Sequence, residues 1–377
     1  MASTNGESDR DLYKGEQIKE FSGIQALYGY FPAPAHHRPA ESRPLVVFVP
    51  GAANFARIAY GGHAGSEPAD FLAHWMNRLG YDFLGVSYPM ESSSPDAELL
   101  RPDWPGLTIA SWGSCDDVIL LAWSMGGRIL QSFMRAAQAC RLNVQLFVSL
   151  AATPGGISGL RPDGRRIVRT GKGYARVLFS DSFVAQIEAM AELNPDHPSQ
   201  PIIPRDVYLR DYFGHTPPQL GIWALHHCAP DDPNADESGF VLNDGLCLEA
   251  AGPTGKDYEL YPWIGAIRPT SVIDLRHVLT DSAAWGMVLS CKLVADAASA
   301  VHPRTPQGAT WNELLDLVYT APEQLTREVV TGNHFFFLGE KGAQGTAAAV
   351  DRLFARSQKL QQRKVELLAM LRQTTPT

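Results

Sequence analysis

Short apolar runs alternate with amphipathic stretches along the amino-terminal part of this chain. The runs are rich in Val, Ile, Leu and aromatic residues and are bounded by turn residues, which is typical of buried strands. A helix is predicted between two of them, where apolar residues recur at helical spacing up to Gly80. This alternation predicts an α/β fold, with a mainly parallel central sheet flanked by helices. The predicted strands cover residues 24–31, 44–49, 82–89, 118–122 and 143–152, and the helix covers 68–79.

The same pattern resumes near the carboxyl end. An apolar run over 267–275 predicts a strand, and residues 281–300 predict a helix that begins at Asp281 or Ser282 as N-cap. A last short strand is expected at 325–330, and 346–371 predicts a helix of about seven turns. Only a short helix, at 107–112, is compatible with the proline-rich stretch before the strand at 118–122.

The alternation fails between about residues 154 and 263. This stretch is rich in Pro, Gly, Asp and aromatic residues and holds one amphipathic run, 182–193. A structureless loop of that length is improbable in a compact domain, so the stretch predicts an inserted cap, or lid, domain. The expected organisation is a flexible leader (1–23), a core in two pieces (24–155 and 265–377) and a cap (156–264).

Composition narrows the class of protein. Apolar residues make up 45% of the chain, which suits a globular protein, and the formal charge of −8 disfavours nucleic acid and anionic membranes as partners. The five cysteines are scattered without a Cys-x-x-Cys pair, so a disulfide framework and a zinc knuckle are both unexpected. The polar amino terminus lacks a signal-peptide core, and no apolar run of about 20 residues predicts a membrane span. A cytoplasmic protein is expected.

Residues 117–127, Asp-Val-Ile-Leu-Leu-Ala-Trp-Ser-Met-Gly-Gly, carry the most specific chemical signal. A buried strand here leads through Ser124 into a helix-compatible stretch, which is the arrangement of a nucleophile elbow. Such a turn is sharp and needs small neighbours, and Ala122, Gly126 and Gly127 supply them. The elbow would expose the Ser124 hydroxyl and place the Met125 N–H at a helix start, where it can stabilise an oxyanion. The alternative is an ordinary strand–turn–helix whose serine caps the helix.

The order of these features resembles the α/β-hydrolase superfamily over residues 24–155 and 265–357. Val-Phe-Val-Pro-Gly-Ala-Ala (47–53) stands where that family has a strand and its oxyanion loop, with Pro50-Gly51 in place of the usual His-Gly. Val-Val-Thr-Gly-Asn-His-Phe-Phe-Phe (329–337) resembles the loop that carries the family's catalytic histidine. The resemblance implies Ser124 as nucleophile, His334 as base, and an oxyanion hole from the N–H groups of Ala52 and Met125. It also implies that no cofactor is needed.

Other histidines fit this role less well. His226 and His227, with Cys228 and nearby aspartates, suggest a metal, but the spacing matches no zinc motif, so no metal is expected. His36, His37 and His63 fall in predicted loops, where they either line a pocket or are solvated.

The triad acid is open among three aspartates. The family's order Ser…Asp…His places the acid after the strand that begins at Ile267, and Asp281 fits the position just past that strand. Asp274 lies within the predicted strand and is the second candidate, and Asp296 is the third. Asp281 is preferred, on the assumption of an insertion around 303–322, and a plain helix N-cap is the competing role for its side chain.

These features together predict a serine hydrolase that cleaves an ester or thioester of a hydrophobic, natural-product-like acyl substrate through an acyl-serine intermediate. Gly-Asn-His-Phe-Phe-Phe is similar to the Gly-Gly-His-Phe-Phe segments of thioesterases that release polyketide or peptide chains, which would suit a carrier-bound substrate. A local basic patch at Arg161, Arg165, Arg166, Arg169 and Lys172 is a candidate contact for an acidic carrier protein. The cap aromatics are candidates to enclose the acyl group or to pack the cap itself: Tyr208, Tyr212, Phe213, Trp223 and Trp263.

Two other functions remain open at this point. An acyltransferase would use the same triad with a second substrate in place of water. A binding protein would use the fold without catalysis, although it would not need a Ser, His and acid set. The sequence predicts no oligomeric state.

Overall fold

The computed structural model describes most of the two predicted core segments and short pieces between them. The described residues are 11–21, 24–38, 43–88, 117–154, 166–169, 175–178, 180–190, 201–214, 226–227, 240–241, 257–298, 301 and 308–374.

An eight-stranded sheet forms the centre of the fold, in the order β1-β2-β4-β3-β5-β6-β11-β12. The strands from β4 to β12 pair in parallel, and β1 and β2 are antiparallel to their neighbours. The mainly parallel sheet predicted from the sequence is therefore present. Its strands are β1 (Glu16–Phe21), β2 (Ile24–Phe31), β3 (Leu45–Val49), β4 (Phe83–Val86), β5 (Asp117–Trp123), β6 (Asn143–Leu150), β11 (Trp263–Arg268) and β12 (Glu328–Val329).

The central strands are apolar because both faces of the sheet are covered. Every residue of β3 and β4 is buried, the first residue of β5 and the last of β11 are partly accessible, and in β6 Asn143 is exposed and Gln145 partly accessible. Continuous burial of this kind is expected of parallel strands between helical layers, and it explains why the sequence shows apolar runs without alternation.

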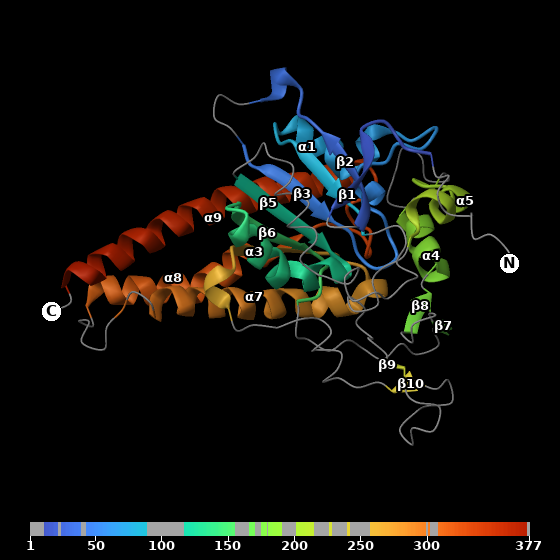
Figure 1. Ribbon diagram of the computed structural model, residues 1–377. Coiled ribbons are helices and arrows are strands. Elements are labelled where there is room, and N and C mark those ends of the chain that lie inside the picture. The colour runs from blue at the N-terminus through green and yellow to red at the C-terminus, as the bar shows by residue number, and fades with distance from the viewer. Residues whose placement is uncertain are drawn as a thin grey trace.

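Helices pack on the sheet and on one another. Helix α1 (Leu72–Arg78) contacts α9 (Glu340–Thr374), α3 (Leu130–Ala139) packs on β6, and α7 (Leu275–Ala298) packs on β11. Helix α8 (Ala309–Leu325) contacts both α7 and α9. Figure 1 shows α9 and α8 extending together past the end of the sheet, so that the last turns of α9 lie far from the strands.

Shorter elements connect these layers. Two two-stranded sheets pair β7 (Arg166–Arg169) with β8 (Ala175–Leu178) and β9 (His226–His227) with β10 (Phe240–Val241). The remaining elements are η1 (Ala35–His37), η2 (Ala56–Ala59), η3 (Pro68–Asp70), η4 (Ser124–Ile129), α4 (Ser180–Met190), α5 (Arg205–Val207), η6 (Tyr208–Tyr212), η8 (Tyr258–Leu260) and η9 (Val272–Asp274).

The expected flexible leader is wrong for residues 11–21. These residues form a turn and strand β1, which pairs with β2. Glu16 is buried and accepts hydrogen bonds from Arg57 at 2.6 and 2.7 Å and from Tyr60 at 2.7 Å. The buried ion pair fixes the amino-terminal segment on η2, and a polar sequence alone gives no sign of such a distant partner.

Two boundaries near the predicted acid are also corrected. Strand β11 starts at Trp263, inside the segment expected to be cap, and ends at Arg268. Pro269 follows directly and has no N–H to continue a ladder, so the apolar residues after it belong to η9 and α7 instead. Helix α7 starts at Leu275, which places Asp281 inside the helix rather than at its N-cap.

Other expectations are met or fall outside the described residues. The predicted helix at 68–79 corresponds to η3 and α1, and the carboxyl-terminal helix is longer than predicted, at Glu340–Thr374. The short helix expected at 107–112 lies outside the described residues. Among the described helices, one segment, Val272–Ala298, is long and apolar enough to span a membrane by length and composition, and Trp285, Leu289 and Leu293 on it are buried in the core.

Candidate active site

The turn between β5 and α3 holds Ser124 in a strained backbone conformation. Its φ is +54°, in the left-handed region that non-glycine residues rarely occupy. A short 3-10 segment, η4, then leads into α3, so the chain reverses directly at the serine. A serine that merely capped the helix would have the extended backbone of an N-cap. The conformation therefore matches the nucleophile elbow predicted from the sequence.

Glycines let the backbone close tightly around this turn. A Cβ on Gly51 would lie 2.5 Å from the Ser124 Cβ, and a Cβ on Gly126 would lie 2.8 Å from the Pro50 carbonyl oxygen. A Cβ on Gly127 would lie 2.6 Å from the carbonyl oxygen of Thr153. None of these contacts is tolerable without a shift, so Gly51 and Gly126 let the loop after β3 pack on the elbow, and Gly127 lets the segment after β6 do the same.

His334 lies on the loop after β12, where the sequence predicts the base. The Trp123 indole N–H donates a 2.9 Å hydrogen bond to the His334 carbonyl oxygen, and the two rings are 5.1 Å apart. Because Trp123 immediately precedes Ser124, this contact fixes the histidine loop beside the elbow. The Phe183 ring of α4 lies 6.4 Å from the His334 ring and nearly parallel to it.

Asp274, the second candidate from the sequence, is the aspartate that contacts His334. Its carboxylate accepts a 2.8 Å hydrogen bond from the His334 Nδ1. Burial raises the pKa of Asp274, but the charge and hydrogen bond of His334 and the charges of His277 and Arg276 lower it further, so the pKa lies below its usual value. An ionised carboxylate on Nδ1 is what a catalytic imidazole needs to keep its tautomer and orientation.

Asp281, the preferred acid in the sequence analysis, lies elsewhere. Its carboxylate is hydrogen-bonded to the Nδ1 of His277, one turn earlier on α7, at 2.9 and 3.1 Å. The structure thus corrects the choice of partner for His334 from Asp281 to Asp274, because β11 ends before Pro269 and Asp274 falls in the turn after the strand. Asp296, the third candidate, pairs with Lys292 farther along α7.

The His334 loop is joined to the elbow through Trp123, the residue before the serine. Among the described contacts, no hydrogen bond joins the Ser124 hydroxyl to His334. Ser124 is 8% exposed and His334 is also buried. Catalytic hydrogen bonds often form only in the reacting complex, so a direct bond is not required in a protein without substrate.

The oxyanion-hole candidates Ala52 and Met125 lie on the two sides of the elbow. Met125 follows Ser124 in η4, and Ala52 follows Gly51, whose backbone packs against Ser124. Met125 is the second residue of η4, and the first N–H groups of a helix have no partner within the helix. The Ala52 N–H donates to no backbone group in the described loops and turns.

The loop that carries Ala52 is held by a segment from the predicted cap. The Asn54 side-chain amide donates to the Ala52 carbonyl at 2.7 Å and accepts from the Tyr208 hydroxyl at 2.9 Å. Two backbone bonds, Phe55 N–H to the Tyr212 carbonyl and Gly214 N–H to the Ala53 carbonyl, are each 2.9 Å long. Asn54 belongs to no sequence motif, because its contact with the Ala52 loop depends on Tyr208, a residue 154 positions away.

The other residues noted in the sequence have separate surroundings. His63 is buried, which lowers its pKa, and its Nδ1 is 2.5 Å from the Tyr212 hydroxyl. Trp263 lies in β11 rather than in a cap, and Phe213 forms a β-bridge with Asn54. His36 and His37 form η1 with no described contact to the elbow. Trp223, Cys228, Arg161, Arg165 and Lys172 lie outside the described residues, as do the side chains of His226, His227, Arg166 and Arg169.

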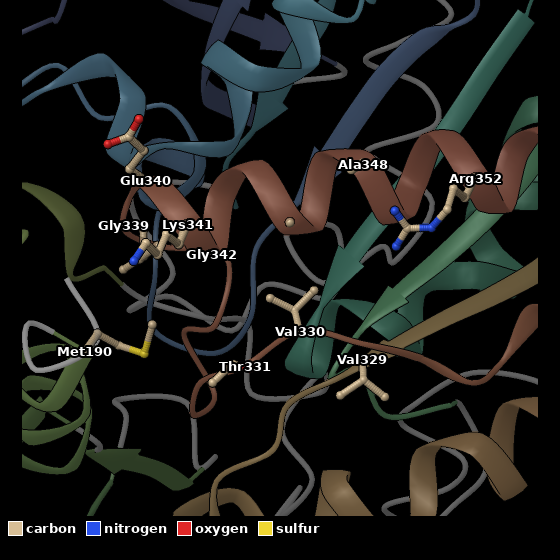
Figure 2. A pocket seen from close by; sticks show the side chains of 12 residues that line it. Met190, Val329, Val330, Thr331, Gly339, Glu340, Lys341, Gly342, Ala348 and Arg352 are labelled. Atoms are coloured by element: carbon tan, nitrogen blue, oxygen red, sulfur yellow. The ribbon is translucent and has the colours of Figure 1, made fainter. Parts of the chain in front are cut away.

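A cavity of about 450 Å³ lies on the outer side of the histidine loop. Figure 2 shows it between Met190 of α4, residues Val329 to Thr331, and the first turns of α9. None of its described lining residues is Ser124, Asp274 or His334. This cavity is therefore separate from the elbow.

The order of strands and site residues identifies the fold. Strand β3 leads to the Ala52 loop, β5 leads to the serine elbow, β11 leads to the turn with Asp274, and β12 leads to the loop with His334. The chain has the α/β-hydrolase fold.

Comparisons with known proteins give only distant likenesses. No protein-family model matches the sequence, and no curated protein matches it. Solved structures with similarity include a thioesterase domain from the curacin biosynthetic pathway (10% identity, TM-score 0.43, 91% of this chain and 100% of that one). A soluble variant of monoglyceride lipase from Saccharomyces cerevisiae shows 10% identity and a TM-score of 0.41 over 96% of this chain and 99% of that one. A variant of tomato methylketone synthase I shows 10% identity and a TM-score of 0.43 over 83% and 100%. Likenesses this distant carry no argument about activity.

Proposed function

We propose that the protein is a serine hydrolase that cleaves an ester or thioester through an acyl-serine intermediate, with Ser124 as nucleophile, His334 as general base and Asp274 as acid. The observation that carries the proposal is the left-handed Ser124 turn placed beside a histidine whose Nδ1 is bound by a buried carboxylate. A strained serine, an imidazole and an aspartate in this relation are rarely assembled for structural reasons alone.

In this mechanism the Ser124 Oγ attacks the acyl carbonyl carbon and its proton passes to the His334 Nε2. The Nδ1 proton stays between the ring and Asp274, which stabilises the imidazolium. Collapse of the tetrahedral intermediate expels the alcohol or thiol, which takes the proton from Nε2. Water then attacks the acyl-serine and gives a proton to the His334 Nε2. Collapse of this second intermediate breaks the bond to Oγ, which takes that proton back, and the acid and the free serine result.

The negative oxygen of each tetrahedral intermediate would be bound by the Met125 and Ala52 N–H groups. Removal of one such donor typically costs about 3–4 kcal/mol of transition-state stabilisation. The Asn54 and Tyr208 side chains support this step indirectly, because they hold the loop on which Ala52 lies.

An apolar acyl group is the substrate best supported by the surface near Asp274. Val272 and Ile273, just before the acid, are 77% and 61% exposed, and Leu275 and Leu279 follow on the first turns of α7 and are also exposed. Contiguous exposed apolar residues commonly mark a binding surface. A hydrophobic acyl chain or a polycyclic group is therefore the acyl part that we propose for the substrate.

The proposal is tested with p-nitrophenyl esters of increasing acyl length and with acyl thioesters, measured with wild type and the Ser124→Ala variant. Hydrolysis is expected to rise with acyl length and to fall by at least about 10³-fold in the variant. An adduct of the acyl mass on the wild type, seen by intact mass spectrometry after a rapid quench, would identify the intermediate. Unchanged hydrolysis by Ser124→Ala would overturn the proposal, and a new ester or amide formed from an added acceptor would instead assign acyl transfer.

A further inference from the structure

A second histidine–aspartate pair lies beside the proposed dyad and has no part in the mechanism above. His277 and Asp281 are both buried, and two hydrogen-bond distances of 2.9 and 3.1 Å join the His277 Nδ1 to the carboxylate. A buried ionisable pair on a helix is costly to desolvate, and an apolar pair would pack as well. A pair buried at this point of α7 is therefore more consistent with a functional role than with packing alone.

The pair is oriented toward the dyad. The His277 ring lies 5.1 Å from the His334 ring at an angle of 32°. One donor or acceptor atom from each of Asp274, His277 and His334 lies within 4.8 Å of the others. Asp281 binds the Nδ1 side of His277, so His277 separates Asp281 from Asp274 and His334.

In this cluster the two carboxylates of Asp274 and Asp281 surround the His277 imidazole. Burial lowers the pKa of His277, but the hydrogen bond and charge of Asp281 and the charge of Asp274 raise it above the ordinary histidine value, against a lowering by Arg276. The charged groups that act on His277 are thus Asp281 and Arg276 on α7, Asp274 on η9, and the neighbouring imidazole of His334. Positive charge on His277 stabilises the Asp274 carboxylate in a buried site.

We propose that His277, held by Asp281, is a positioning residue that keeps Asp274 ionised and in register with His334. A role in catalysis for this pair rests on the proposed function, whereas its electrostatic effect on His334 does not. A positive charge on His277 would also oppose a second positive charge on the adjacent His334 ring.

Two substitutions remove this charge in different ways. His277→Gln deletes it directly, and Asp281→Asn removes the partner without which burial returns His277 to the neutral state. His277→Gln is expected to move the midpoint of His334 protonation to higher pH, on the order of one pH unit, because a positive charge about 5 Å away is lost. Asp281→Asn is expected to give a smaller rise, because the Asp281 anion is lost together with the His277 charge. The double variant is expected to match Asp281→Asn, because neither position is charged in either protein.

The matched control is Asp296→Asn. Asp296 forms the other i,i+4 ion pair on α7, with Lys292 at 2.8 Å, and it also binds Lys364 rather than the dyad. A general loosening of α7 would appear in this variant too, whereas an effect through His277 would not.

The experiment is an NMR titration of histidine-labelled protein in a Ser124→Ala background, which needs no activity, together with the pH profile of kcat/KM in the active background. The inference is supported if the pH midpoint of His334 protonation rises in His277→Gln and Asp281→Asn but not in Asp296→Asn. The acidic limb of the kcat/KM profile should move in the same direction. Unmoved midpoints in both variants overturn it, even if the enzyme hydrolyses esters. A shifted midpoint in a protein without hydrolysis would leave this inference standing and reject the proposed function.

Discussion

The backbone of Ser124 is conformationally strained, and the surrounding packing holds it in that conformation. A non-glycine residue in the left-handed region costs on the order of 1 kcal/mol, and here the glycines at 51, 126 and 127 leave the turn no room to relax. Strain at one residue, close packing around it and a buried histidine beside it are consistent with a site selected for reactivity rather than stability.

The strain gives a direct prediction for Ser124→Gly. Glycine adopts φ near +54° without penalty, so this variant should be more stable than Ser124→Ala by about 1 kcal/mol, or roughly 1–3 °C in Tm. Both variants should be inactive. Differential scanning calorimetry of the two proteins makes the comparison, and equal midpoints would show that the turn is unstrained.

Gly51→Ala tests the close approach of the oxyanion loop to the serine. The new methyl group would lie 2.5 Å from the Ser124 Cβ, so the loop must move away and take the Ala52 N–H with it. We expect kcat for ester hydrolysis to fall at least about 100-fold. Gly308→Ala is the control, because nothing lies within 4 Å of its added Cβ. Full activity in Gly51→Ala would exclude this loop from the oxyanion hole.

At the scale of elements, the site depends on segments that meet from distant parts of the chain. The Ala52 loop follows β3, yet its conformation is fixed by η6 through Asn54 and by hydrogen bonds to residues 212–214. The histidine loop follows β12 and is held by Trp123 from β5 and by α4, where the Gln186 carbonyl accepts from the Asn333 side chain at 2.7 Å. Elements from the predicted cap therefore support both halves of the site.

Tyr208→Phe tests the support of the oxyanion loop. The variant removes the donor to the buried Asn54 side chain, which frees Asn54 to release the Ala52 carbonyl. We expect kcat to fall by about tenfold with KM little changed, since the loop acts in the transition state. Tyr319→Phe, at a residue that is largely exposed, should leave both constants unchanged. A normal kcat in Tyr208→Phe would show that η6 does not support the oxyanion loop.

Glu328 on β12 gives a pH-dependent prediction for stability. Burial raises its pKa, but Arg352 and Arg356 of α9 lower it more, with contacts of 2.7 Å each, so the folded-state pKa lies below the unfolded value. Its contribution is present above the unfolded pKa and is lost as the pH falls through the folded one.

Glu328→Gln should therefore destabilise the protein at pH 7, by about 1 kcal/mol because both arginines are partly exposed. The difference from wild type should shrink below about pH 4. Urea unfolding across this pH range measures it. Glu323→Gln, which breaks an exposed ion pair with Arg327, is the control and should have little effect at any pH. A pH-independent difference would contradict the assignment to charge.

At the scale of the whole molecule, the sequence predicts the parts that depend on local pattern. Buried parallel strands, the elbow and the histidine loop were predicted because each has a short signature in adjacent residues. The aspartate that contacts His334 is Asp274 rather than Asp281, because the apolar residues Val272 and Ile273 extend the apparent strand beyond Pro269 although they are exposed. Strand β1, the Glu16–Arg57 pair and the Asn54–Tyr208 contact depend on partners far along the chain, which a single sequence does not show. The cap boundaries and the substrate stay predictions.

The most direct test of the account is the rate of fluorophosphonate labelling, with peptide mapping of the adduct, in wild type and in the Ser124→Ala, His334→Ala, Asp274→Asn and Asp281→Asn variants. The account predicts an adduct on Ser124 that is absent without Ser124 or His334, slowed at least about 100-fold in Asp274→Asn, and slowed no more than about tenfold in Asp281→Asn at neutral pH. An unlabelled wild type, or an Asp281→Asn variant slower than Asp274→Asn, would contradict it.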